Sequence, residues 1–356
     1  MVNQRSKVTP VLVTPLLLQF VPCRLQANKI IMFSSSSESE DSDLETSRRN
    51  VQSTIWIGNE DGEIFMFNFL DNARLKACER LLRLSMPVDD IAYLDEKVFV
   101  SISSSSHIQL LYFLRNKEGV WDLDNPKTVC LDFRTRLRPM TAAVSRLCFA
   151  SGNSLYLFNA YSLQIEKQSM LSSNTAEMVA CLAVIGSTIF VAMAKSSTIK
   201  VINAFTLECL LEFNISHIVS KALSSREEII RKHKMGCLRI TSLLCCKKRL
   251  WIGTSAGIII NTAISNTRTL NWTPSFNVCQ AGHIGSCRFL TAVSASAAPS
   301  FDLRRRRMSL SAPTLQQLEQ MFVISGGEGF DSCALEVDGE KRETEDSINH
   351  LLFWSA

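Results

Sequence analysis

Six stretches of the chain repeat one pattern of hydrophobic and polar positions, in which an apolar run meets a short turn and usually a second apolar run. The two clearest copies are TIWIGNEDGEIFMF at residues 54–67 and LWIGTSAGIII at residues 250–260. Weaker copies lie at residues 97–113, 146–159, 187–203 and 321–330. Apolar runs rich in β-branched and aromatic residues around a short turn are typical of β-hairpins. The pattern therefore predicts an all-β chain.

The spacing of the hairpins indicates how they are arranged. The equivalent positions in the six copies are Gly58, Ser101, Ala150, Ala192, Gly253 and Ser325. The first three gaps between them are 43, 49 and 42 residues, and the last two are 61 and 72. A WD40 propeller blade repeats about every 40–45 residues, so the longer gaps leave room for insertions.

Further apolar runs precede and follow the hairpins. Those at residues 88–94, 178–185 and 238–246 come just before a hairpin, whereas residues 127–133 and 205–213 come after one. An inner strand, two middle strands and an outer strand make a propeller blade. Residues 53–356 are therefore predicted to form a WD40-like β-propeller of six or seven blades. The first hairpin has no obvious inner strand before it, which leaves the blade number and the closing strand open.

Residues 1–52 differ in composition, and we expect them to be a disordered extension. Residues 8–23 are apolar but carry three prolines, and they fall short of the roughly 20 residues that span a bilayer. A signal peptide is the alternative, although no clear cleavage site follows. Residues 34–45 form an acidic, serine-rich linker, in which Ser37 and Ser42 each precede an acidic residue by three positions and are candidate phosphorylation sites.

Composition narrows the classes of function. The net charge of +4 over 356 residues does not indicate a nucleic-acid-binding protein. Twelve cysteines form no C-x-x-C pair and mostly lie in apolar runs, which indicates a reducing, cytoplasmic compartment. Phosphate-loop and dinucleotide motifs are absent, and we expect no cofactor and no stable membrane insertion.

The segment GTSAG at Gly253–Gly257 matches the nucleophile elbow of serine hydrolases, with Ser255 as the nucleophile. That elbow requires a helix after the serine, whereas three isoleucines follow here, and the first copy has Glu60 at the equivalent position. A hairpin turn fits better, and the hydrolase remains the minor alternative. Glycines would then be kept for turn geometry with positive φ. The expected turn glycines are Gly58, Gly62, Gly253 and Gly257.

A second chemical hypothesis is a zinc site. Its candidate ligands are His233, Cys237, Cys279, His283 and Cys287. They would bind a metal only if their segments met in space, and their spacing matches no recognised zinc motif. We therefore expect no metal.

Two segments interrupt the strand pattern. Residues 225–234 predict a short helix with Ser225 and Glu228 as a capping box, either structural or part of a docking face. Residues 301–320 contain four arginines, Arg304–Arg307, ahead of Ser309. This arrangement is read by basophilic kinases, so Ser309 is a further candidate phosphorylation site, with a solvated basic loop as the alternative.

Several long motifs resemble one family in the same order. The segments at residues 228–260, 282–293, 324–330 and 346–354 are similar to the C-terminal propeller of large Rho guanine nucleotide exchange factors. The resemblance covers roughly residues 53–356 and departs from the family at residues 331–340. It implies a WD40-like propeller in a cytoplasmic regulator of Rho GTPases and the actin cytoskeleton.

The resemblance also limits the expected activity. Exchange in this family belongs to a Dbl-homology domain followed by a pleckstrin-homology domain, and neither occurs in this sequence. No catalytic residue is therefore carried over, and we expect a non-catalytic interaction module whose partners are Rho-GTPase regulators and cytoskeletal proteins. The unusual N-terminus indicates a fragment, a short isoform or an imperfect gene model. The alternative is a scaffold propeller of the JNK-interacting protein type.

Overall fold

The computed structural model describes residues 27–33, 54–68, 80–129, 131–264, 272–294, 321–332, 344–345 and 350–356. The chain forms two compact units, one of residues 20–179 with 204–207, and one whose described part lies in residues 180–203 and 208–356. Ser37, Ser42, Ser309 and the segment Arg304–Arg307 lie outside the described residues. Among the described residues, no helix is long and apolar enough to cross a membrane.

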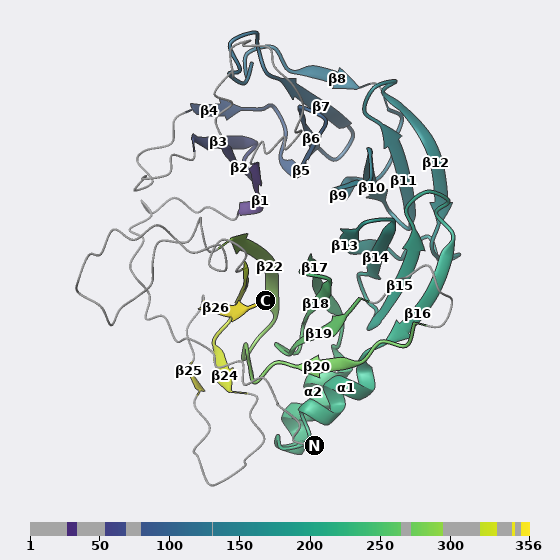
Figure 1. Cartoon of the computed structure of the whole chain (residues 1–356), viewed down its shortest axis with the longest axis vertical. Coiled ribbons are helices and arrows are strands. Elements are labelled where there is room, and N and C mark those ends of the chain that lie inside the picture. The colour runs from purple at the N-terminus through teal and green to yellow at the C-terminus, as the bar shows by residue number, and fades with distance from the viewer. Residues whose placement is uncertain are drawn as a thin grey trace, which may run out of the picture. The chain divides into compact units, whose positions relative to one another are not determined.

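The first unit contains three four-stranded antiparallel sheets, each running in chain order from its first strand to its fourth (Figure 1). Their strands are β1 (Ala27–Phe33), β2 (Thr54–Asn59), β3 (Glu63–Asn68) and β4 (Arg80–Arg83); β5 (Val88–Leu94), β6 (Lys97–Ser103), β7 (Ile108–Leu114) and β8 (Lys127–Val129); and β9 (Leu137–Ala143), β10 (Arg146–Ser151), β11 (Ser154–Asn159) and β12 (Gln164–Met170).

The second unit contains two further four-stranded sheets and two three-stranded ones. The four-stranded sheets are β13 (Val179–Ile185), β14 (Thr188–Met193), β15 (Thr198–Asn203) and β16 (Cys209–Asn214), and β17 (Ile240–Cys246), β18 (Arg249–Thr254), β19 (Ile259–Ala263) and β20 (Phe276–Val278). The three-stranded sheets are β22 (Cys287–Ser294), β23 (Met321–Gly327) and β26 (His350–Ser355), and the short β21 (Ala281–Gly282), β24 (Phe330–Ser332) and β25 (Thr344–Glu345).

This arrangement confirms the predicted blade. The runs expected as inner strands appear as β5, β13 and β17, and the following hairpins supply the two middle strands. The outer strands β8 and β16 overlap the segments predicted after the hairpins. Counting the sheet of β22, β23 and β26 as a blade, the described residues provide six blade sheets.

The first sheet differs from the expectation in one respect. Its inner strand β1 lies at Ala27–Phe33, inside the segment that was expected to be a disordered extension, and it pairs with β2 from Ala27 opposite Asn59 to Phe33 opposite Thr54. The segment ends in the apolar run IIMF, which can pair with the apolar β2. The expectation of an extension reaching to residue 52 was therefore wrong for residues 27–33.

Aromatic side chains fill the core of the first unit. Trp56 and Trp121 are fully buried with ring centroids 5.5 Å apart in an edge-to-face arrangement, and Phe113 packs on Trp56 at the same distance. The indole nitrogens of Trp56 and Trp121 both donate to Thr54 Oγ1, over 3.2 and 3.0 Å. Each buried indole N–H is thereby satisfied, as buried aromatic groups of this kind require.

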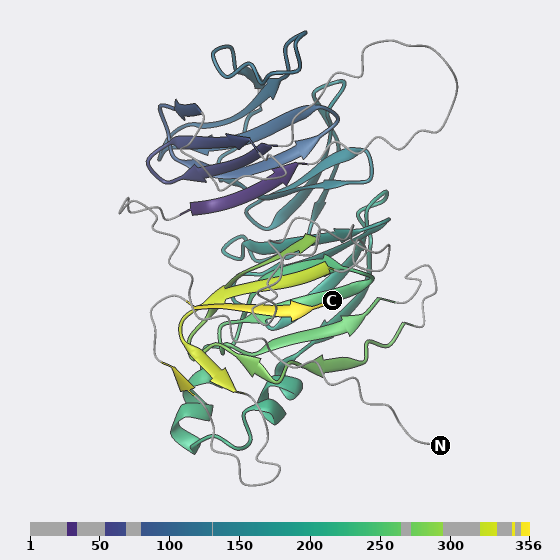
Figure 2. The same cartoon turned by 60° about the vertical axis from the view of Figure 1, so that its left-hand side comes forward.

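Two helices lie between β16 and β17 in the second unit. They are α1 (Ser216–Ala222) and α2 (Glu228–Gly236), and they lie side by side in both views (Figures 1 and 2). The predicted helix is therefore present, but its expected cap is wrong. The helix begins two residues later than a cap at Ser225 would require. Its N-cap residue is Glu227, which makes no side-chain cap hydrogen bond.

Candidate protein-interaction site on a helical insertion

The helical insertion, here defined as residues 215–239, is held to the second unit by its first helix. Val219 of α1 is fully buried, and Ile215 and Leu223 on either side of it are buried as well. All three belong to a core cluster that β13, β14, β15, β17, β18 and β19 also line. α1 is therefore the part of the insertion that builds the core.

Two cations fix the remainder of the insertion. Lys234 on α2 donates from Nζ to the carbonyl oxygens of Ala256 and Ile284, each at 2.7 Å. Arg226, between the helices, forms an ion pair with Asp331 on β24, and their side chains are only 14% and 2% exposed. Removing one partner of an ion pair withdrawn from water in this way leaves an uncompensated buried charge, so the two side chains are held together. α2 is thus held by Lys234 on the helix and by Arg226 just ahead of it.

The opposite side of α2 faces solvent. No residue of α2 is buried, and its first apolar residues, Ile229 and Ile230, are 81% and 40% exposed. Met235, on the inward side, packs against the core as a partly buried residue. The core-facing side of α2 therefore carries Lys234 and Met235, whereas Ile229 points to solvent. A rigidly attached helix that displays an aliphatic side chain is suited to contacting another protein.

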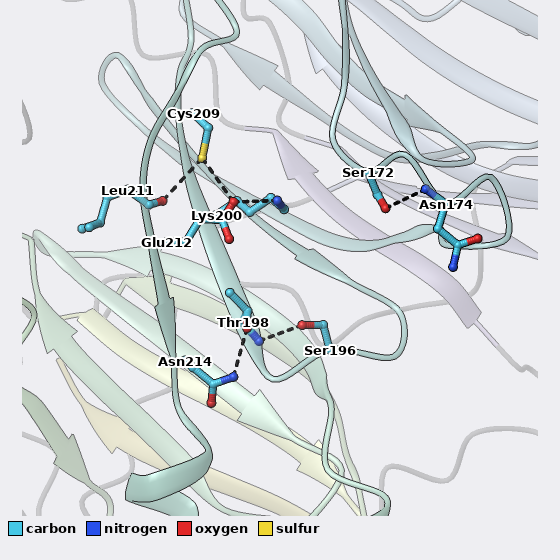
Figure 3. Close-up of polar contacts among 9 residues, drawn as sticks. All are labelled: Ser172, Asn174, Ser196, Thr198, Lys200, Cys209, Leu211, Glu212 and Asn214. Atoms are coloured by element: carbon cyan, nitrogen blue, oxygen red, sulfur yellow. Dashed lines mark hydrogen bonds and ion pairs between the residues drawn. The ribbon is translucent and has the colours of Figure 1, made fainter.

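A different surface is formed by the edge of the sheet of β13–β16, where side chains pair across the strands (Figure 3). Lys200 on β15 lies opposite Glu212 on β16, with Nζ 2.6 Å from Oε1. Asn214 Nδ2 donates to Thr198 Oγ1 over 3.0 Å. Cross-strand pairs of this kind stabilise the sheet and give its edge a polar, charged surface that resists further strand pairing.

Cys209 belongs to the same edge and is exposed. Its Sγ lies 3.7 Å from both Leu211 O and Glu212 Oε1. Partial burial and the neighbouring Glu212 carboxylate raise the pKa of the Cys209 thiol, so the thiolate is disfavoured. The geometry gives this cysteine no nucleophilic activation.

Ser255 lies in the turn between β18 and β19, which is the predicted strand–turn–strand order. Its hydroxyl donates to Cys237 O over 2.8 Å and accepts from the Arg239 amide at 2.9 Å. Both partners are main-chain groups that tie the hairpin to the end of the helical insertion. The elbow pattern in the sequence thus reflects turn geometry, because no helix follows the serine.

The four glycines play two different parts. Gly62 and Gly257 have φ of +80° and lie in hairpin turns. Gly58 and Gly253, expected in turns with positive φ, instead lie within β2 and β18. A Cβ at Gly58 would lie 2.6 Å from Val88 Cγ1, and one at Gly253 would lie 2.6 Å from Cys287 Sγ. These two glycines permit close approach of a neighbouring strand.

The zinc hypothesis is not supported by the described residues, since no group of three or more histidine, cysteine or acidic side chains there could hold a metal ion. Its five candidate ligands have separate environments. His233 and Cys237 are exposed, whereas Cys279, His283 and Cys287 are buried. Cys279 Sγ accepts from Asn261 Nδ2 at 3.6 Å, and Cys287 Sγ lies 3.6 Å from Ser242 Oγ. Cys279, His283 and Cys287 recur every four residues, as on one face of a helix, but they lie in irregular and strand segments.

His283 belongs to a buried hydrogen-bond network instead. Its Nε2 lies 3.0 Å from Ser325 Oγ and its Nδ1 lies 3.1 Å from Gly329 O, while Trp354 Nε1 donates to Ser325 Oγ over 3.4 Å. Burial lowers the pKa of His283 to about 4, so the imidazole is neutral near pH 7. This network connects the turn before β22 with β23 and β26.

The sequence carries a signal for the structural part played by His283, but none for the ion pair of the insertion. Gly282 and His283 form a G-H dipeptide ahead of a strand, which belongs to the WD40 blade signature and could have identified the histidine. The ion pair of Arg226 with Asp331 joins residues far apart in the chain, and no local pattern announces it.

Comparison with known proteins identifies the family to which the chain belongs. A model described as "WD40 repeated domain" matches residues 23–320. The chain is 37% identical over 324 residues to Rho guanine nucleotide exchange factor osg-1 of Caenorhabditis elegans, which covers 90% of this chain and 27% of that protein. It is 32% identical over 335 residues to mouse Rho guanine nucleotide exchange factor 17, which covers 85% of this chain and 16% of that protein.

A second group of relatives is more distant. The mouse C-Jun-amino-terminal kinase-interacting protein 4 is 24% identical over 354 residues, which covers 85% of this chain and 26% of that protein. Among solved structures, the β-propeller domain of Myceliophteria thermophila Cps50 (Swd1) aligns with a TM-score of 0.50 at 11% identity, over 86% of this chain and 94% of that one. This last likeness concerns the fold alone.

The chain thus spans about a quarter or less of the length of the Rho exchange factors that it resembles. The matched region includes five of the six blade sheets described above and the first strand, β22, of the sixth. On these grounds the chain belongs to the WD40 repeated-domain family, and its propeller is homologous to the matched part of Rho guanine nucleotide exchange factors.

Proposed function

We propose that this chain is a non-catalytic protein-interaction propeller that acts in the regulation of Rho GTPase signalling in the cytoplasm. The observation that carries the proposal is the identity of 37% and 32% to two Rho guanine nucleotide exchange factors over 85–90% of the chain. Propeller blades expose rigid strands and loops for partner proteins. The helical insertion, with its anchored α2 and exposed Ile229, supplies one such surface.

A scaffold of the JNK-interacting protein type is the second candidate. Identities of 24–27% to several such proteins over 82–85% of the chain favour it. These identities are lower than those to the Rho exchange factors, so a role in Rho GTPase signalling is preferred. In both candidate functions the chain binds other proteins, so the identity of the bound proteins distinguishes the two.

Affinity capture from cell extract separates the two candidates. The immobilised chain is expected to retain regulators of Rho GTPases and cytoskeletal proteins, identified by mass spectrometry. Retention of kinesin or dynein adaptors in their place would favour the JNK-interacting type. An unrelated WD40 propeller on the same resin is the control, and proteins that it also retains are discounted because they bind any propeller.

A nucleotide-release assay tests the non-catalytic part of the proposal. The purified chain at about micromolar concentration is expected to leave the release of a fluorescent nucleotide from Rho unchanged. An exchange factor accelerates that release, so any concentration-dependent increase would contradict the proposal.

A further inference from the structure

Ser225 lies in the turn between α1 and α2, and neither the fold nor the proposed function uses it. It was expected to cap α2, but the N-cap residue is Glu227. Ser225 is exposed, and within the part of the chain that the structure describes its hydroxyl forms no hydrogen bond. By contrast, Ser216 at the start of α1 and Ser255 beside the end of the insertion both use their hydroxyls in hydrogen bonds. The Ser225 hydroxyl therefore has no structural part among the described residues.

Two glutamates follow Ser225, at the second and third positions after it. Glu227 is exposed and extended, with φ of −52° and ψ of 140°, so the chain from Ser225 to Glu227 lies outside the helix. Glu228 begins α2, and its side chain is 64% exposed even though it pairs with Lys232. An ion pair as exposed as this one contributes little and opens readily. Both carboxylates are therefore accessible to a protein that approaches Ser225.

The one cation in this segment is turned away from solvent. Arg226 follows Ser225 directly, but its guanidinium pairs with Asp331 and its side chain is only 14% exposed. The exposed charges between Ser225 and Ile230 are therefore both carboxylates. Protein kinases distinguish their substrates by such charge patterns, because opposite charge on the kinase favours encounter and orientation. This segment is suited to a kinase whose substrate groove is basic.

We propose that Ser225 is a phosphorylation site for a protein kinase that selects serines followed by acidic residues. In this reaction the bond between the γ-phosphorus of ATP and its bridging oxygen breaks, and a bond from that phosphorus to Ser225 Oγ forms. ADP leaves, and the hydroxyl proton passes to the catalytic carboxylate of the kinase. The site goes beyond the proposed function, because it does not depend on which partner the propeller binds.

The phosphate has two candidate targets near Ser225, and their energetics decide between them. One is Arg226, but withdrawing its guanidinium would leave the Asp331 carboxylate buried without a counter-charge, which a solvent-exposed contact does not offset. The other is the first turn of α2, where Glu227 provides no side-chain cap hydrogen bond. A phosphate carries about −1.5 to −2 charges near pH 7, and helix N-termini favour negative charge. Phosphorylation is therefore expected to order the start of α2 and to leave the insertion attached.

The test uses the full chain, ATP and an acid-selective serine kinase, and mass spectrometry locates each phosphate. A synthetic peptide of residues 219–233 is the reference for the same segment without the fold. Ser225 in the full chain is expected to be modified at a rate within about tenfold of that in the peptide, because opening the end of a helix costs little. Locating each phosphate separates Ser225 from Ser37 and Ser42, which the sequence also predicts as sites.

The key variant is Glu228→Gln, which keeps the size of the side chain and removes the charge at the third position. The rate of modification at Ser225 is expected to fall about tenfold, because the kinase loses an opposite charge to bind. Lys232→Met releases Glu228 from its ion pair and is expected not to lower that rate. Ser224→Ala, which removes the neighbouring exposed serine, is the matched control and is expected to leave modification of Ser225 unchanged.

Hydrogen exchange measures the structural effect of the phosphate. The amides of residues 229–232 are expected to exchange about two- to fivefold more slowly in the phosphorylated chain, which is the range that a negative charge at a helix N-terminus gives. The amides of α1 are the internal reference and are expected to stay unchanged, because Val219 holds that helix in the core.

Three results would overturn the phosphorylation site. They are modification of the peptide but not of the full chain, modification of Ser224 in place of Ser225, and equal rates for the wild type and Glu228→Gln. Faster exchange of the α2 amides after phosphorylation would overturn the expected capping, because it would mean that the phosphate draws Arg226 away from Asp331. Capture of Rho regulators from extract does not enter any of these results, so the proposed function is tested separately.

Discussion

Gly253 on β18 lies so close to Cys287, the first residue of β22, that a Cβ at the glycine would stand 2.6 Å from the cysteine sulfur. The equivalent Gly58 on β2 meets Val88, the first residue of β5, at the same distance. Ser101 on β6 occupies the third equivalent position, and its hydroxyl donates to the carbonyl of Leu137, the first residue of β9, over 2.8 Å. A small residue at this repeated position therefore lets the next inner strand begin against the middle strand of the blade before it.

The first prediction follows from this contact. Gly253→Ala is expected to lower the free energy of unfolding by about 1–3 kcal/mol, because the added methyl overlaps the side chains of Ser242 and Cys287 in a packed interior. Urea denaturation monitored by tryptophan fluorescence measures the change. Gly236→Ala is the matched control, since its Cβ meets nothing within 4 Å and the residue ends a helix. A loss of the same size in the control would show that the contact at Gly253 is not the cause.

The repeated small residue also shows what could be predicted from the sequence and what could not. Periodic apolar runs predicted the blade hairpins, because alternation and turn chemistry are local properties. The role of Gly253 was misread as a turn requirement, since the strand it meets begins 34 residues later. The inner strand β1 was missed because a long polar segment separates it from β2.

The same limit applies to the candidate interaction site. The helix at residues 225–234 was predicted from a capping box at Ser225 and Glu228, and it appears as Glu228–Gly236 without that cap. Its attachment could not be predicted, because Lys234 binds carbonyl groups at Ala256 and Ile284, and Arg226 pairs with Asp331. Those partners are brought together only by the folded sheets. Exposure of Ile229 follows from that attachment and was likewise not visible in the sequence.

The second prediction concerns Gly257. Gly257→Ala is expected to destabilise the chain by more than about 2 kcal/mol, because φ is +80° and the new Cβ would overlap the carbonyl oxygen of His283. Gly119 has φ of +82° with nothing within 4 Å of its Cβ position, so Gly119→Ala reports the conformational cost alone, about 1 kcal/mol. Thermal denaturation of both variants measures the difference. Equal losses would mean that the overlap with His283 is relieved by movement of the turn.

Ser255→Ala, in the same hairpin, gives the third prediction. The hydroxyl bonds two main-chain groups at a partly exposed turn, so its removal is expected to cost only about 0.5–1.5 kcal/mol. If Ser255 were a nucleophile, the variant would abolish hydrolysis of an activated ester such as p-nitrophenyl acetate while keeping the fold. Ester hydrolysis by the wild type that the substitution removes would therefore contradict the hairpin interpretation.

The fourth prediction is a dependence of stability on pH. The pKa of His283 is lowered by burial from its ordinary value of 6.5 to about 4, so the folded state favours the neutral ring. Between these two values the unfolded chain binds a proton that the folded chain excludes, and stability falls as pH decreases. The contribution lost between pH 7 and pH 4 is on the order of 3 kcal/mol.

The His283→Asn variant isolates this contribution from that of the carboxylates. Urea denaturation at pH 7, 6 and 5 is expected to show a steeper loss for the wild type than for the variant, because only the wild type has the titrating ring. Parallel losses for the two proteins would mean that His283 is protonated in the folded state as readily as in the unfolded one.

The last prediction tests how the helical insertion is held. Asp331→Asn removes the carboxylate charge facing Arg226, whose side chain is 14% exposed, and leaves that guanidinium buried beside a neutral group. Breaking a buried ion pair by changing one partner typically costs about 3–5 kcal/mol, whereas an exposed pair on a helix contributes less than about 0.5 kcal/mol. Lys232→Met, which removes the exposed partner of Glu228, is therefore the matched control. Urea denaturation measures the cost, and hydrogen exchange of the α2 amides is expected to rise in Asp331→Asn well above its value in Lys232→Met. If α2 stays equally protected in both variants, the pair does not anchor the insertion, and Lys234 with its two carbonyl partners must hold the helix.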